Sequence, residues 1–174
     1  MNIHPLFVHF PVALLTLYAV LECIRFKKLN DLPAWPYLKI SLLVLGTVGA
    51  LAALLTGDMA RQFHRDVRQL VSMHELFGQM TTIIFGILAV NYIILIAERF
   101  GLKGFLPPWL QKLWALLVTV RNALFGTPLV ILLALLGLVS LVITGALGGI
   151  IVYGPSTDPV TLFVNKVLSP YYNR

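Results

Sequence analysis

The chain has little charge. Of its 174 residues only 11% are Asp, Glu, Lys or Arg, whereas 59% are apolar. Soluble domains carry about a quarter charged residues. A disordered chain is excluded because disorder requires low hydrophobicity. A soluble single domain is disfavoured because one small core cannot hide this much apolar surface. The composition therefore predicts a polytopic membrane protein.

Several chemical signatures are also missing. Cys23 is the single cysteine, so an intramolecular disulfide framework is excluded. The net charge is +6, but the basic residues are not gathered on a polar face, so nucleic-acid binding is not expected. The sequence has no cysteine cluster, no glycine-rich phosphate loop and no order of residues that fits a Ser-His-Asp triad. Nothing indicates hydrolysis or phosphoryl transfer.

Four apolar stretches are long enough to cross a bilayer, which takes about 20 residues. They cover residues 6–24, 38–56, 72–97 and 128–153. The first is no cleavable signal peptide, since it lacks a basic leading segment and Glu22 follows the apolar run. We predict an all-α, four-helix membrane bundle over residues 1–153. The extramembrane tail, 154–174, should form a short helix over 160–168, because Thr157-Asp158-Pro159 is typical of a helix start.

The connection between the third and fourth spans is long enough to hold a helix of its own. Pro107-Pro108 can begin it, and the residues that follow separate into two faces at helical spacing. The polar face holds Gln111, Lys112, Ala115, Thr119 and Asn122, and the apolar face holds Trp109, Leu110, Leu113, Trp114, Leu117 and Val120. We expect an amphipathic helix over about 108–122 that lies in the membrane interface. The alternative is a fifth, partial span packed into the bundle.

The positions of Lys and Arg predict an orientation, because cytoplasmic loops are enriched in both. The first and third connections hold eight of them near the ends of the spans, and the second connection and the tail hold five. We therefore expect a bacterial inner-membrane protein with both termini in the periplasm.

In this topology all four histidines lie toward the same face of the membrane. His4 and His9 begin the first span, His64 lies in the second connection, and His74 is in the first turn of the third span. An imidazole inside an apolar span is costly without a partner, so His9 and His74 are functional candidates. His64, between arginines, is typical of a surface histidine, and His4 suits an interfacial position.

Haem iron in a membrane bundle is typically held by histidines from facing helices. His9 and His74 lie at comparable depth, and each is followed by small residues that would leave room for a macrocycle. These are Ala13 and Thr16 after His9, and Gly78 and Thr82 after His74. His4 and His64 would form a second pair, and Arg61, Arg65 and Arg68 would neutralise the propionates. We expect one or two b-type haems, with His9 and His74 as the primary ligands.

Other interpretations of the same residues stay open. The histidines and the small-residue stripes also suit ordinary helix packing. His4, His9, His74, Asp58 and Glu75 would suit a non-haem zinc, copper or iron site. His74 and Glu75 would serve a proton-coupled transporter, although four helices with one buried acid make a poor substrate pathway.

The opening of the chain carries a family resemblance. Residues 2–15, NIHPLFVHFPVALL, resemble the start of a family of small four-helix bacterial membrane proteins of unknown function, which opens with His-Pro-x-x-Val-His-Phe-Pro-Ile-Ala-Leu. Further similarity lies at 55–58 (LTGD), 73–78 (MHELFG) and 144–154 (TGALGGIIVYG). Residues 101–127 and 154–174 depart from the family pattern, and both additions suit docking surfaces for partner subunits.

Members of that family are often joined to, or found beside, Rieske-type or cytochrome c-type electron carriers. The resemblance therefore implies a redox role, that of a membrane cytochrome b-like protein with its haem near the periplasmic face and periplasmic carriers as partners. The alternative is a cofactor-free structural or assembly subunit of a larger respiratory or photosynthetic complex, or of a homo-oligomer. An electron carrier or complex subunit is expected rather than a stand-alone enzyme.

Overall fold

The computed structural model describes residues 4–24, 26–60, 67–125, 127–155 and 158–172, and within them the side chains of all but 4–7 and 58–60. The described residues are helical and contain no strand, which confirms the all-helical expectation. The helices are α1 (His4–Cys23), α2 (Lys27–Asn30), α3 (Trp35–Ala60), α4 (Arg68–Arg99), the 3-10 helix η3 (Leu102–Phe105), α5 (Pro108–Phe125), α6 (Leu129–Tyr153) and α7 (Pro159–Tyr172).

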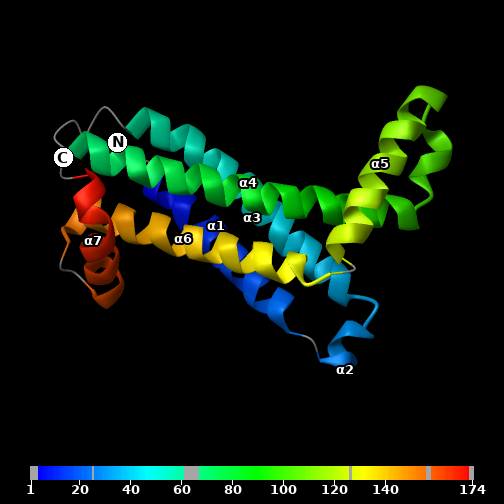
Figure 1. The fold of residues 1–174 in the computed structure, drawn as a ribbon, viewed down its shortest axis with the longest axis horizontal. Helices are drawn as coiled ribbons and strands as arrows, with labels where there is room; N and C mark the ends of the chain where they lie inside the picture. The colour runs from blue at the N-terminus through cyan, green and yellow to red at the C-terminus, as the bar shows by residue number, and fades with distance from the viewer. Residues whose placement is uncertain (1–3, 25, 61–66, 126, 156–157, 173–174) are drawn as a thin grey trace.

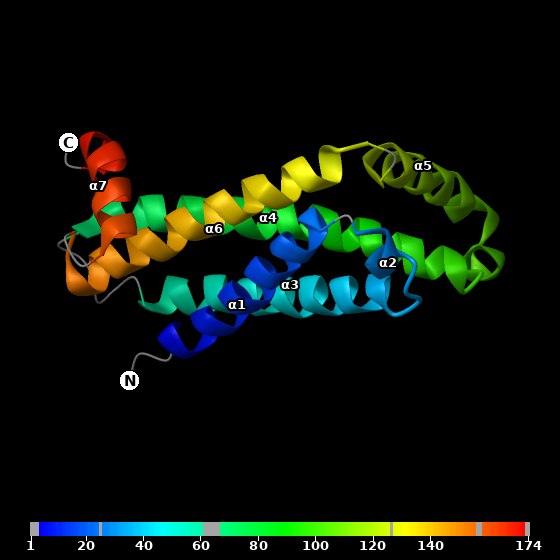
Figure 2. The same ribbon diagram turned by 90° about the horizontal axis from the view of Figure 1, so that it is seen from below.

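Four long helices form the bundle. Helices α1 and α4 each pack against α3 and α6, so α1 and α4 occupy opposite corners of a four-membered ring (Figures 1 and 2). Among the described residues, α3, α4 and α6 are long and apolar enough to cross a membrane, and the described apolar part of α1, Val8–Cys23, is shorter. Helix α1 crosses α3 obliquely in Figure 2. The predicted spans lie largely within these four helices.

Aromatic side chains fill the centre between the opposite corners. Tyr18 of α1 meets the edges of Phe85 and Tyr92 of α4, with ring centroids 6.0 and 6.1 Å apart. Phe125, at the end of α5, extends the series with its ring 4.8 Å from that of Tyr92. Edge-to-face pairs of this kind stabilise the fold by about 0.5–1.5 kcal/mol beyond the free energy gained by burying the rings. They therefore join α1 to α4 although the two helices are not neighbours in the ring.

Two shorter helices, α5 and α7, lie at the two ends of the bundle. In Figure 1, α5 leans away from one end and α7 crosses the other. Helix α5 is tied to α4 by Arg121, whose Nη2 lies 2.6 Å from Oε2 of Glu98. The stripe formed by Trp109, Leu113, Leu116 and Val120 is not covered by protein. An uncovered apolar stripe suits the predicted interfacial helix and does not suit a partial span buried in the bundle.

The start of α7 is capped as its sequence predicts. The backbone N–H groups of Val160 and Thr161 donate to Oδ1 of Asp158 at 2.8 and 3.0 Å, and Pro159 occupies the first turn. The hydrogen bond from the Thr161 backbone holds the pKa of the Asp158 carboxyl below its usual value. The helix runs on to Tyr172, four residues beyond the expected end, because Val164 and Tyr172 are buried against the bundle.

Some of the glycines, but not all, lie where two helices approach each other closely. A Cβ at Gly46 of α3 would lie 2.7 Å from Cδ2 and 2.8 Å from Cγ of Leu15 on α1. A Cβ at Gly137 of α6 would lie 2.9 Å from Cζ of Phe85 on α4. At Gly86 of α4 there is nothing within 4 Å. Close backbone approach through small residues is the main packing device of helices in lipid.

We predict that Gly46→Ala destabilises the bundle, whereas Gly86→Ala does not. The new methyl group at 46 would overlap Cγ as well as Cδ2 of Leu15, so α1 and α3 would have to separate, at a cost of about 1–3 kcal/mol. Thermal unfolding of the purified protein in detergent, followed by circular dichroism, measures the difference. Equal melting temperatures for the two variants would contradict the assigned α1–α3 contact.

Candidate functional site

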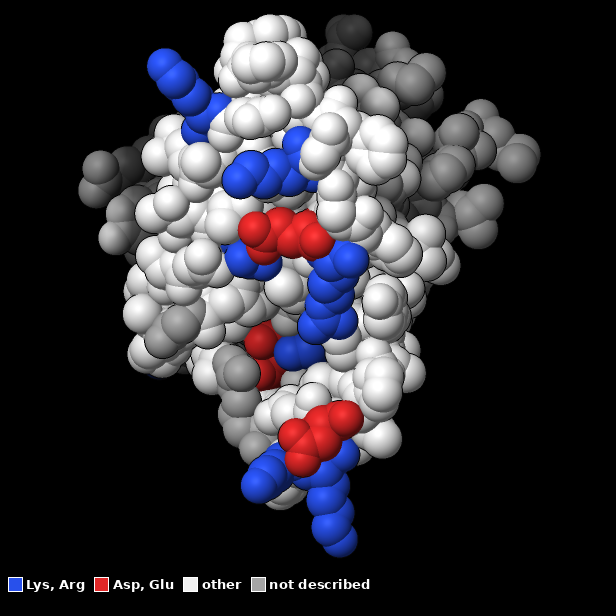
Figure 3. Space-filling model, turned by 90° about the vertical axis from the view of Figure 1, so that its right-hand side faces the viewer, with Lys and Arg blue, Asp and Glu red and all other residues white. Residues whose placement is uncertain are grey.

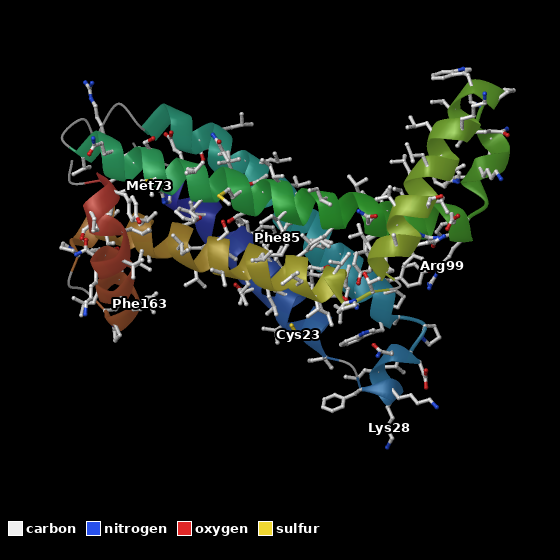
Figure 4. All side chains as sticks on the ribbon, viewed as in Figure 1. Cys23, Lys28, Met73, Phe85, Arg99 and Phe163 are labelled. Carbon is white, nitrogen blue, oxygen red and sulfur yellow. The ribbon has the colours of Figure 1, made fainter. Side chains whose placement is uncertain are left out.

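His74 lies near the start of α4, where the helix packs against α6. Its Nδ1 is 2.9 Å from the backbone oxygen of Thr144 on α6, and the side chain is half-buried. The label of Met73 in Figure 4 marks this turn of α4, close to α7 at one end of the bundle. The histidine that begins the third expected span therefore faces a neighbouring helix and is turned away from lipid.

This hydrogen bond assigns the proton on the imidazole ring. A backbone carbonyl oxygen can only accept, so Nδ1 must donate to Thr144. In a neutral ring the lone pair then resides on Nε2. Histidines that bind metals are commonly held in this way, with one ring nitrogen donating to a carbonyl and the other available to coordinate. The hydrogen bond to Thr144 therefore fixes the tautomer and the orientation of the His74 ring.

The surroundings of His74 are small residues and hydroxyls. A Cβ at Gly148 of α6 would lie 3.2 Å from Cε1 of His74, so the absence of a side chain there allows the ring to reach α6. One to two turns further along α4, Ser140 of α6 donates to the backbone oxygen of Phe77 at 2.9 Å and accepts from Thr81 at 3.0 Å. We call this row of polar residues between the two helices the α4–α6 seam. It consists of His74, Thr81, Ser140 and Thr144.

Gly78 lies on the same side of α4 as His74, as the sequence predicts. A Cβ there would meet Cδ2 of Leu54 at 3.5 Å and Cγ2 of Thr144 at 3.7 Å, which are ordinary contact distances. Gly78 is therefore packed between α3 and α6. The small residue beside the His74 ring itself is Gly148, which belongs to the small-residue stripe expected in the fourth span, with Gly137, Ser140 and Thr144.

His9 has a different setting. The buried stripe of α1 comprises Pro11, Leu15, Tyr18 and Glu22, and His9 lies outside it with its side chain exposed. Ala13, one turn further along, is exposed as well. The small residues after His9 thus belong to the outer face of α1. In this structure His9 and His74 do not face a common space between α1 and α4.

The other expected site residues lie outside the part that the structure describes in full. His4 begins α1, but its side chain is not described, and neither is that of Asp58. His64 and Arg61 lie outside the described residues. Among the side chains that are described, no three His, Cys, Asp or Glu residues come together as a metal-binding group. The structure therefore presents one inward-facing histidine from the expected set.

The structure also shows a polar cluster that the sequence analysis does not predict. At the opposite end of the bundle from His74, Nζ of Lys39 on α3 donates to Oε2 of Glu22 on α1 at 3.0 Å. The hydroxyl of Tyr92 on α4 donates to the same oxygen at 2.6 Å. The ammonium also lies 5.7 Å from the centroid of the Tyr92 ring, within cation–π range.

This Glu22–Lys39–Tyr92 cluster is almost fully enclosed. The side chain of Glu22 is 1% exposed and that of Lys39 is 9% exposed. A buried pair of opposite charges is tolerated only when hydrogen bonds complete it, as Tyr92 does here. Lys39 lies in the second turn of α3 and Glu22 in the last turn of α1. An acid and a base placed inside the ends of consecutive apolar spans, with a tyrosine in a later span, are the signal that would have indicated the cluster.

Comparison with known proteins gives the chain a family. The model of a family described as "Predicted membrane protein (DUF2231)" matches residues 1–157. The chain belongs to this family. The match confirms a membrane protein of unknown function and covers all four long helices of this DUF2231 member. Helix α7 lies beyond the matched residues. No curated protein and no solved structure gives a significant match.

We predict that Lys39→Met destabilises the protein far more than the double change Glu22→Gln with Lys39→Met. The single change leaves the Glu22 carboxylate buried without its cation, which costs about 3–5 kcal/mol, whereas removal of both charges is close to neutral. A double-mutant cycle of thermal unfolding in detergent measures the coupling. Additive effects of the two single changes would show that the two charges do not interact.

Proposed function

We propose that the protein is a membrane cytochrome b-like electron carrier in which His74 would hold the iron of a b-type haem. The observation that carries the proposal is the hydrogen bond from Nδ1 of His74 to the Thr144 backbone oxygen, inside a helix long and apolar enough to cross a membrane. It fixes the orientation of the ring and its tautomer, as a hydrogen bond from one ring nitrogen commonly does for a ligating histidine. Haem, when bound, would supply one-electron exchange.

The chain's own residues have three tasks in this proposal. Thr144 and Gly148 of α6 hold the His74 ring in one orientation. The apolar helices around it exclude water, which governs the reduction potential of a haem. A second iron ligand would come from His4, His9 or His64, as expected from the sequence. Ligation by His9 would require a haem at the outer face of α1, because its side chain is exposed there.

The setting is a bacterial inner membrane. Four crossings by α1, α3, α4 and α6 would put both chain ends on one side. The end that carries α2 and α5 is rich in Lys and Arg, so it belongs in the cytoplasm by the positive-inside rule. The His74 end then faces the periplasm, where Rieske-type or cytochrome c-type carriers would exchange electrons with the protein, as the family resemblance implies.

A second candidate function is a cofactor-free structural subunit of a larger membrane complex. The close contact between His74 and Gly148 favours it, because the ring fills the α4–α6 seam. In this case the imidazole would only fill space and make a hydrogen bond between α4 and α6. The two candidates differ in whether purified protein absorbs visible light.

We expect protein purified from haem-replete cells to show the sharp reduced band of a low-spin haem. His74→Ala should remove at least one haem's share of that band and retain the helical circular dichroism. Gln79→Ala, an exposed polar position on the same helix, is the matched control and should leave the spectrum unchanged. Absorption spectroscopy with haem extraction gives the stoichiometry. Colourless, metal-free wild-type protein would reject the electron-transfer function and favour the structural subunit.

The orientation has its own test. A reporter that is active only in the cytoplasm should be silent when fused after Arg174 and active when fused after Asp31, between α2 and α3. The reason is the excess of basic residues near α2 and α5. The Asp31 fusion controls for expression and insertion. An active fusion after Arg174 would place His74 near the cytoplasm.

A further inference from the structure

One end of the bundle carries a net positive charge that its internal ion pairs do not neutralise. Among the described residues, this end holds seven Lys and Arg and three carboxylates. Lys39 is paired with Glu22, and Arg121 with Glu98. The remaining five, which we call the cationic rim, are all exposed. The cationic rim consists of Lys27, Lys28, Arg99, Lys103 and Lys112.

The cationic rim comes from three separate segments. Lys27 and Lys28 lie on α2, Arg99 ends α4, and Lys103 and Lys112 lie on η3 and α5. Figure 3 looks onto this end and shows lysines and arginines spread down the face, with acidic groups among them. Lys28 and Arg99 are both labelled at this end in Figure 4. Asp31 is the one exposed carboxylate here among the described residues. At the opposite end, the side chains that the structure describes are balanced in charge, with Arg68 and Lys166 against Glu75 and Asp158.

Large apolar side chains alternate with these cations and are not covered by protein. Phe105 is 86% exposed and Trp109 is 74% exposed, and both neighbour rim lysines along the chain. Phe26 precedes Lys27, and Phe100 follows Arg99. Each segment of the rim therefore offers an apolar group beside a charged one.

The faces of α5 show how the two kinds of group divide. Its uncovered apolar stripe runs through Trp109, Leu113, Leu116 and Val120. Arg121 lies about 100° around the helix from that stripe, on the side that packs against α4. The polar residues Gln111, Thr119 and Asn122, with the small Ala115, occupy the remaining arc. Lys112 stands between the apolar stripe and the polar arc, where its ammonium can reach headgroups while the stripe enters hydrocarbon.

We infer that the cationic rim binds the headgroups of anionic phospholipids. A phospholipid has a charged group directly above a hydrocarbon chain, and each segment of the rim presents the complementary pair. Basic residues near an anionic leaflet are attracted to it, and aromatic residues anchor at the same depth. A soluble acidic partner would complement the charge but would leave Phe105 and Trp109 exposed to water.

The tryptophans make the inference measurable. All three in the chain, Trp35, Trp109 and Trp114, lie at this end, so lipid quenching of fluorescence reports on the rim and not on the His74 end. The full-length protein is placed in vesicles of phosphatidylcholine and phosphatidylglycerol, with bromine on the chains of one lipid or the other. At low salt, the quenching by brominated phosphatidylglycerol should correspond to a local concentration of this lipid around the tryptophans about fivefold above its share of the vesicle. The reason is that one basic residue contributes about 1 kcal/mol near an anionic surface.

Charge variants test the residues. The triple change Arg99→Gln, Lys103→Gln and Lys112→Gln removes three of the five rim cations and should lower the enrichment clearly below that of the wild-type protein. The matched control, Arg68→Gln with Lys166→Gln, also removes cations but at the opposite end, and should keep the wild-type enrichment. Arg68 and Lys166 are exposed, as the rim residues are.

A salt series on the wild-type protein covers the case in which the triple variant does not insert. Enrichment should fall as salt rises from about 0.05 to about 0.5 M, because exposed charges are screened over that range. Equal quenching by the two lipids would overturn the inference and favour a protein partner for the rim. An enrichment that survives the triple change, or that does not respond to salt, would overturn it as well.

Discussion

Hydrocarbon provides no hydrogen-bond partner, and this constraint explains where the polar side chains of the bundle lie. An unsatisfied polar group in the bilayer costs several kcal/mol. Hydroxyls inside the helices therefore donate to a carbonyl one turn back, as Thr47 does to Leu43 at 2.7 Å. Other polar groups reach a neighbouring helix, and Thr81 does both, since it also contacts Ser140 on α6. The α4–α6 seam and the Glu22–Lys39–Tyr92 cluster are the two places where such groups gather among the described residues.

These two polar sites lie at opposite ends and differ in kind. At the end with the Glu22–Lys39–Tyr92 cluster, full charges of opposite sign cancel and a tyrosine completes the pair. The cluster ties three helices together. At the other end the α4–α6 seam joins two helices through hydroxyl groups and the His74 ring. The proposed haem ligand thus lies at the end of the bundle away from the buried ion pair.

The helices could be predicted from the sequence because hydropathy and caps are local signals. The long apolar runs indicate α3, α4 and α6, and Asp158-Pro159 indicates the start of α7. Which side of each helix is buried in the bundle could not be predicted in the same way. Helix α1 is apolar on all sides, so nothing in its pattern separates the buried stripe of Leu15 and Tyr18 from the exposed side that carries His9. Gly46 and Gly86 likewise look alike in sequence, although only Gly46 closes a helix contact.

The candidate site was predictable in part for the same reason. His74 is identifiable because an imidazole in an apolar span is unusual. Its partner is a backbone oxygen, which every residue possesses, so the sequence gives no sign of Thr144. Lys39 and Glu22 are each interpretable as ordinary charges at the end of a span. Their pairing depends on how α1 crosses α3, which is decided by close contacts such as that between Leu15 and Gly46.

The α4–α6 seam itself offers an argument about His74. Ser140 solves the same packing problem further along the seam with a small hydroxyl that reaches the Phe77 oxygen and Thr81. A serine or threonine at 74 would satisfy the same chemistry without a large ring, and without the requirement that position 148 lack a side chain. Histidine is the more demanding solution, because its larger ring must be accommodated between the two helices. What the ring adds over a hydroxyl is a rigid imidazole held in one orientation across the α4–α6 seam, which suits the proposed ligand role of His74.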